Sequence, residues 1–161
     1  MITYKSCLPV MKTLNETNDC TVKAVSVVTD TPYIKAHALM KAKGRPHRKG
    51  SFHSKTVIKE LGFSVERIAN FPAKTIATLE QYCDPKKRYI AEVRGHILAI
   101  VNGKVEDWTR GGDLAAAALL AHHNHASEKQ RKPSRRHINS VYEVTALQSK
   151  NAIRKAKRYA K

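Results

Sequence analysis

The chain reads NETNDCTVKA over residues 15–24, where a polar loop meets the start of an apolar helix. Asp19 or Asn18 can act as the N-cap, and the apolar residues that follow give the helix a surface to bury. Cys20 then lies in the first helical turn. Free backbone N–H groups and the positive end of the helix dipole favour a thiolate there, so we predict a nucleophilic sulfur with a lowered pKa. A small core side chain is the alternative interpretation.

The patterns along the rest of the chain predict an α+β domain. Residues 1–14, around Pro9, are expected to be an extended lead-in, so that the helix beginning at Cys20 is the first of the fold. Further helices are expected over 32–43, 54–61 and 73–83. Strands are expected over 63–68, 88–94, 96–101, 104–108 and 138–145. We expect the helices to pack on one face of an antiparallel sheet.

Asn102-Gly103 predicts a two-residue hairpin that brings a histidine and an aspartate together. Residues equidistant from such a turn face each other, so residue 98 faces Asp107 and His96 lies diagonally from it on the same face. Diagonal neighbours can interact. Thiol catalysis needs a base and a group that orients it, and His96 and Asp107 are candidates for those roles. Trp108 can exclude water from the pair or anchor the opposite side of the sheet.

Asp19-Cys20-Thr21-Val22 at a helix start, followed by Gly95-His96 and later by Asp107-Trp108, resembles the papain-like cysteine peptidase superfamily. The likeness covers residues 13–110. It is closest to small members, similar to bacteriocin-processing peptidases and to short phage-encoded proteins. The resemblance implies a papain-like fold with Cys20 as nucleophile, His96 as general base and acid, and Asp107 as the orienting group.

A tetrahedral intermediate also needs donors for its oxyanion. The backbone N–H of Cys20 is one, and a side-chain amide shortly before it is the expected second, with Asn15 preferred over Asn18. The resemblance implies a glutamine six residues before the cysteine, but that position holds Leu14.

The chain carries 30 Lys and Arg against 13 Asp and Glu, a formal charge of +17. Residues 127–161 alone hold 11 Lys or Arg and 2 Glu, a net +9. We divide the chain into a peptidase-type domain over 1–145 and a basic helical tail over 146–161. Such a field attracts nucleic acid, acidic protein surfaces or anionic lipid. The candidate polyanion-binding residues are Lys129, Arg131, Lys132, Arg135, Arg136, Arg154, Lys155, Lys157 and Arg158.

Other polar groups are interpreted without a cofactor. The three cysteines are odd in number and form no Cys-x-x-Cys pair, so neither a disulfide framework nor a cysteine zinc site is indicated. His122, His123 and His125 are interpreted as a polar helix end in preference to a metal site, and His37 as a helix-face residue. The basic loop 44–50 is either a solvated turn or a phosphate contact. We expect neither metal nor nucleotide to be needed.

These observations predict a cysteine peptidase or amidase that hydrolyses peptide or isopeptide bonds through a thioester. The alternative is an inactive papain-like scaffold that serves as a basic nucleic-acid-binding or virion protein. No apolar run is long enough to cross a membrane, and residues 1–10 do not resemble a signal peptide. We therefore expect a cytoplasmic location, in the host or in the virion if the protein is phage-encoded.

Overall fold

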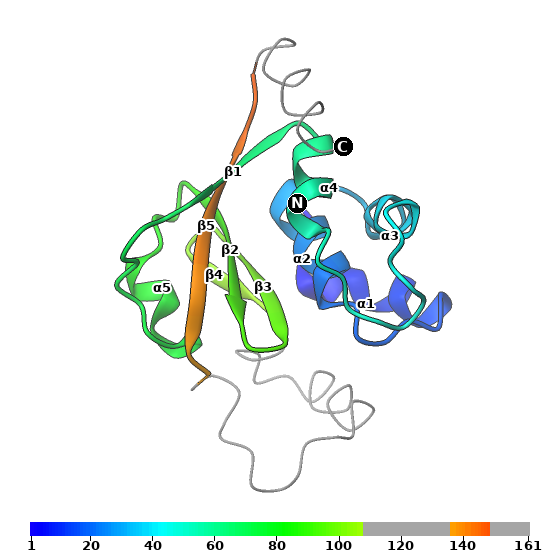
Figure 1. The fold of residues 1–161 in the computed structure, drawn as a ribbon, viewed down its shortest axis with the longest axis horizontal. Helices are drawn as coiled ribbons and strands as arrows, with labels where there is room; N and C mark the ends of the chain where they lie inside the picture. The colour runs from blue at the N-terminus through cyan, green and yellow to red at the C-terminus, as the bar shows by residue number, and fades with distance from the viewer. Residues whose placement is uncertain (108–135, 149–161) are drawn as a thin grey trace, which may run out of the picture.

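The structure is a computed structural model that describes residues 1–107 and 136–148 (Figure 1). These residues form a mixed α+β fold with five α-helices and a five-stranded antiparallel sheet. The helices are α1 (Tyr4–Thr13), α2 (Cys20–Thr29), α3 (Tyr33–Ala42), α4 (Ser54–Glu60) and α5 (Leu79–Tyr82), the last preceded by the 3-10 turn η1 (Ile76–Thr78). The strands are β1 (Phe63–Arg67), β2 (Arg88–Val93), β3 (His96–Val101), β4 (Lys104–Glu106) and β5 (Ile138–Ala146).

The expectation of an extended N-terminus is wrong, because residues 4–13 form helix α1. Thr3 caps its start in a capping box with Ser6, and Tyr4, Cys7 and Met11 bury one stripe of the helix. That stripe outweighs the break signal of Pro9, which lies inside the helix. Cys20 therefore begins the second helix of the fold and not the first.

Helix α2 is the centre of the helical layer. Every residue from Thr21 to Thr29 is buried, and the helix contacts α1, α3, α4 and strand β3. Val22, Val25, Val27 and Val28 are fully buried, and each contributes about 1.5–3 kcal/mol by leaving water. A helix held from so many sides gives its first residue, Cys20, a fixed place beside the sheet.

The strand order is β1-β5-β2-β3-β4, and every neighbouring pair is antiparallel. Strand β5 returns to the sheet as predicted, and the structure places it between β1 and β2. The hairpin at Asn102-Gly103 is confirmed: both residues have positive φ, and Val101 pairs with Lys104. The next pairs, Ile100 with Val105 and Ala99 with Glu106, have the predicted register.

Both faces of the sheet are covered, which corrects the expectation that all helices lie on one face. Helices α1–α4 cover one face, and Ile90, Ala99, Val101 and Val144 of the sheet join their core. On the other face, Ile76, Leu79 and Cys83 pack against Leu98 and Ile100 (Figure 1). The helix expected over 73–83 is shorter, because Thr75 caps a 3-10 turn before the four residues of α5.

Several predicted features lie outside the described residues. They are Trp108, the histidines at 122–125, and all the candidate polyanion-binding residues except Arg136. In the part of the chain that the structure describes, no helix has the length and apolar character needed to cross a membrane.

Candidate active site

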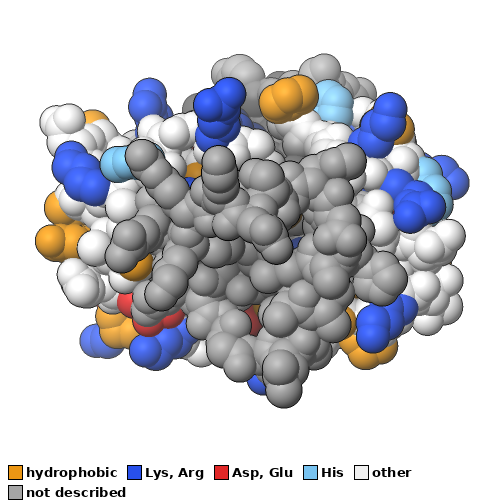
Figure 2. Space-filling model, turned by 90° about the horizontal axis from the view of Figure 1, so that it is seen from below, with side chains coloured by type: hydrophobic (Ala, Val, Ile, Leu, Met, Phe, Trp, Pro, Cys, Tyr) orange, Lys and Arg blue, Asp and Glu red, His pale blue; other side chains and the backbone are white. Residues whose placement is uncertain are grey.

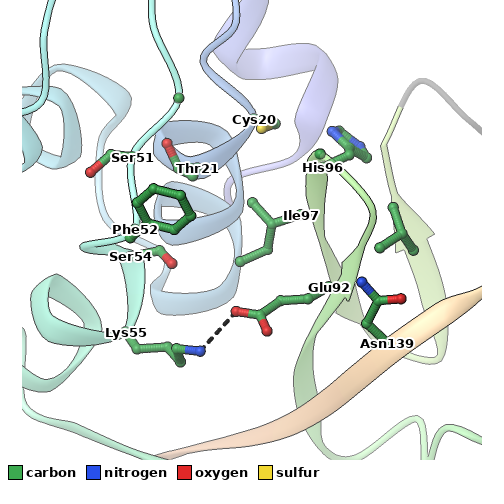
Figure 3. A pocket seen from close by; sticks show the side chains of 13 residues that line it. Cys20, Thr21, Ser51, Phe52, Ser54, Lys55, Glu92, His96, Ile97 and Asn139 are labelled. Atoms are coloured by element: carbon green, nitrogen blue, oxygen red, sulfur yellow. Dashed lines mark hydrogen bonds and ion pairs between the residues drawn. The ribbon is translucent and has the colours of Figure 1, made fainter.

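Cys20 is the first residue of α2 and a free, half-buried cysteine. It lines a pocket of about 560 Å³ with His96 of β3, and Figure 3 shows the two residues at the same end of that pocket. The first N–H groups of a helix have no partner within it, so the start of α2 brings hydrogen-bond donors and the positive end of its dipole to the sulfur.

The structure brings His96 and Asp107 together across the β3–β4 hairpin. Nε2 of His96 donates to Oδ2 of Asp107 over 2.7 Å, and the two side chains are only 6% and 4% exposed. Asp107 directly follows β4, one step beyond the pair of Ala99 with Glu106, which is where the predicted register places it. Because Nε2 is engaged with the carboxylate, Nδ1 is the ring nitrogen left for the sulfur.

The pKa values of Cys20 and His96 shift in opposite directions. Burial raises the pKa of Cys20. The hydrogen bond and positive charge of His96, with the backbone N–H of Ile97, lower this pKa by a larger amount, so the net shift is downward. Burial lowers the pKa of His96, but the charge and hydrogen bond of Asp107, with help from Cys20, raise it to about 10. Opposite shifts of this kind favour a thiolate beside an imidazolium at neutral pH.

Neither predicted oxyanion amide lines the pocket. Asn18 uses Nδ2 to donate to the backbone carbonyl of Arg48 over 3.3 Å. Asn15 is exposed just beyond the end of α1, in a left-handed conformation with φ 50°. The backbone N–H groups at the start of α2 have no partner within the helix and are candidate donors, and the side-chain assignments stay predictions.

A buried ionic cluster that the sequence did not predict holds the loop before Cys20. The carboxylate of Glu16, whose side chain is fully buried, accepts two bonds from Arg45, at 3.0 and 2.9 Å. It also accepts from Nε2 of His37 at 2.7 Å and from the backbone N–H of Arg48 at 3.0 Å. His37 and the loop 44–50 therefore have a structural partner that neither interpretation of the loop included.

A second buried carboxylate belongs to Asp19, the residue directly before the cysteine, and its contacts hold that residue in place. Its Oδ2 accepts from the Tyr33 hydroxyl at 2.7 Å, and its Oδ1 lies 2.8 Å from Nζ of Lys23. No cap hydrogen bond comes from its side chain, so Asp19 occupies the N-cap position but contributes through these contacts. The spacing between Glu16 and Arg45 follows no local period, so the partners were not visible in the sequence.

The pocket extends from Cys20 along the seam between the helices and the sheet. Its floor holds an ion pair between Lys55 and Glu92, and the fully exposed Phe52 stands at its side (Figure 3). The remaining described lining residues are Thr21, Gly50, Ser51, Ser54, Val93, Gly95, Ile97 and Asn139. A cavity of this size beside a thiol and an imidazole has room for a ligand.

Within residues 1–107 and 136–148, no group of three His, Cys, Asp or Glu side chains is placed to hold a metal ion. The described site brings together a thiol, an imidazole and a carboxylate. Comparisons with protein-family models, with curated proteins and with solved structures found no match.

Proposed function

We propose that the protein is a cysteine peptidase or amidase of the papain-like type, with Cys20, His96 and Asp107 as its catalytic residues. The observation that carries the proposal is the position of the His96 ring, which hydrogen-bonds the carboxylate of Asp107 and lies with Cys20 at the same end of the pocket, where it lowers the pKa of the thiol. The resemblance of the sequence around Cys20 and His96 to small phage-type peptidases supports the same conclusion.

In the proposed reaction, the thiolate of Cys20 attacks the carbonyl carbon of a peptide or isopeptide bond. The carbonyl oxygen becomes an oxyanion, and the backbone N–H of Cys20 donates to it. His96 gives its Nδ1 proton to the leaving amine as the C–N bond breaks, which leaves a thioester on Cys20. His96 then takes a proton from water, the hydroxide attacks the thioester, and the acid product leaves as the thiolate of Cys20 is regenerated beside the imidazolium.

Asp107 orients and charges the imidazole in both halves of this reaction. Its hydrogen bond to Nε2 keeps Nδ1 directed at the sulfur, and its negative charge stabilises the imidazolium. The low exposure of both side chains strengthens this interaction because water screens it little. The carboxylate thus acts through His96 and not on the substrate.

The test is the rate at which iodoacetamide alkylates each cysteine at pH 6.5, followed by mass spectrometry of the peptides. Cys7 and Cys83 are internal references, since burial raises the pKa of both thiols, that of Cys83 to about 11. We expect Cys20 to react about a hundredfold faster than either. A second measurement is the hydrolysis of a denatured protein or a synthetic peptide library. We expect the wild type to hydrolyse it and Cys20→Ala to lose this activity. Equal alkylation of the three thiols would contradict the proposal.

A second candidate function follows from the net charge of +17. On the face of the molecule shown in Figure 2, Lys and Arg side chains are spread around the margin and acidic side chains are few. An inactive papain-like scaffold that binds nucleic acid would need only this charge. It predicts DNA or RNA affinity that falls steeply with salt, is weakened by deletion of 149–161 and is unchanged in Cys20→Ala.

A further inference from the structure

The pocket beside Cys20 has apolar walls and a charged end. Ile97 of the sheet lies on one side, and Phe52 of the loop before α4 lies on the other (Figure 3). Phe52 is 99% exposed, so it buries no surface in the folded protein. An exposed aromatic ring beside a cavity is suited to cover the apolar part of a bound side chain.

The charged end of the pocket is a hydrogen-bonded pair. Nζ of Lys55 donates to Oε1 of Glu92 at 2.8 Å and to the Tyr142 hydroxyl at 3.2 Å. Oε2 of Glu92 accepts from the hydroxyls of Ser140 at 2.7 Å and Tyr142 at 3.3 Å. The two partners have 35% and 30% of their side chains exposed, so a molecule in the pocket can reach them.

Counting donors and acceptors shows what the pair can still bind. An ammonium group has three N–H donors, and the bonds above use two of those of Lys55, which leaves one. Oε1 of Glu92 accepts one bond and has a second lone pair. The pair is electrically neutral as a whole. It therefore offers one donor and one acceptor, side by side, at one end of the pocket.

We propose that this pocket selects substrates by a long, uncharged side chain next to the scissile bond, whose tip both donates and accepts hydrogen bonds, as glutamine and tyrosine do. The proposal rests on the proposed hydrolase function. The stem of such a side chain packs on Phe52 and Ile97, and its tip bonds to Lys55 and Glu92. A lysine or glutamate tip brings a charge that the neutral pair does not compensate, and a leucine removes water from the pair without replacing its bonds.

The first test uses tripeptide vinyl sulfones, in which the two residues nearest the reactive group are varied in turn among Gln, Tyr, Leu, Lys and Glu. The thiolate of Cys20 adds to the vinyl carbon and His96 protonates the neighbouring carbon, so a stable thioether records each binding event. At one of the two positions, we expect Gln and Tyr probes to label Cys20 about tenfold faster than Lys, Glu or Leu probes, which corresponds to one good hydrogen bond.

The second test changes the charge of the pocket. In Lys55→Met the Glu92 carboxylate remains, so the Lys probe should become the fastest. In Glu92→Gln the Lys55 ammonium remains, so the Glu probe should become the fastest. Both residues are partly exposed, so we expect both variants to fold. Lys87→Met is the matched control. Lys87 lies just before β2, forms an ion pair with Glu143 at 2.9 Å and does not line the pocket.

The outcomes separate this inference from the proposed function. One outcome is that iodoacetamide alkylates Cys20 rapidly but the probes label it in the same order of rate in the wild type, Lys55→Met and Glu92→Gln. This outcome overturns the pocket assignment alone. Slow alkylation of Cys20 overturns the hydrolase function on which it depends. Opposite changes of preference in the two variants, with none in Lys87→Met, support the assignment.

Discussion

Cys20 and Cys83 both lie at an end of a helix packed against the same sheet, yet their chemistry differs. Cys20 is the first residue of α2, and Cys83 follows the last residue of α5. The pKa of Cys20 is lowered because His96 and a backbone N–H stabilise the thiolate against the effect of burial. Burial and the charge of Glu80 raise the pKa of Cys83 to about 11. The comparison shows that a thiol is activated by what the sheet places beside it.

Removing the imidazole should erase the difference between the two cysteines. We expect His96→Ala to reduce peptide hydrolysis by about 10³–10⁴-fold, because no group then transfers the proton to the leaving amine. Alkylation of Cys20 at pH 6.5 should fall to about the rate of Cys83. His137→Ala, at an exposed histidine just before β5, is the control and should leave both rates unchanged. Persistent rapid alkylation in His96→Ala would show that the helix alone activates the sulfur.

The loop before Cys20 is held by the buried ionic cluster at Glu16, and the described contacts of Cys83 include no such cluster. Glu16→Gln leaves the fully buried guanidinium of Arg45 without its counter-charge, so we expect a loss of about 3–5 kcal/mol in unfolding free energy at pH 7. Urea unfolding measures this loss. Glu143→Gln removes a more exposed ion pair and should cost at most about 1 kcal/mol. Similar values for the two variants would contradict the importance of the buried cluster.

The same carboxylate predicts a pH dependence. Burial raises the pKa of Glu16, but the bonds from Arg45 and His37 lower it by a larger amount, so the pKa is about 2. A folded-state pKa below the ordinary value of about 4.5 stabilises the protein above that value, and the contribution is lost as the pH falls toward 2. The unfolding free energy of the wild type should therefore fall across this window, and Glu16→Gln should lack that part of the decrease.

Asp107→Asn tests the contribution of charge beside Cys20 and His96 while keeping the size of the side chain. The pKa of His96 should fall from about 10, because the charge of Asp107 is the main influence that raises it. We expect hydrolysis to decrease about a hundredfold and its alkaline limit to move to lower pH, since the imidazolium proton is lost earlier. A pH–rate profile measures both. An unchanged alkaline limit would assign that limit to another group.

Cys83→Ala should have the smallest effect. It removes a buried sulfur and leaves a small cavity beneath the sheet, so we expect a cost of about 1 kcal/mol in stability. Hydrolysis and the alkylation of Cys20 should not change, and urea unfolding with an activity assay tests both. A loss of activity in this variant would mean that the core around Cys83 positions the active site through the sheet.

Local signals explain which parts of the fold were predictable. Asn102-Gly103 specifies a two-residue hairpin, and the hairpin register alone places Asp107 near His96. Helix α1 was not predicted because Pro9 resembles a helix break. Its buried stripe of Tyr4, Cys7 and Met11 stabilises the helix only when it packs on the rest of the core.

The sequence by itself determined the α+β class, the hairpin and the three residues proposed for catalysis, because helix starts and tight turns depend on neighbours along the chain. Tertiary structure alone decided that β5 enters between β1 and β2, that Arg45 neutralises Glu16, and that Lys55 and Glu92 meet beside Cys20. These contacts join residues with no periodic spacing. Only the packing of two layers around one core brings them within bonding distance.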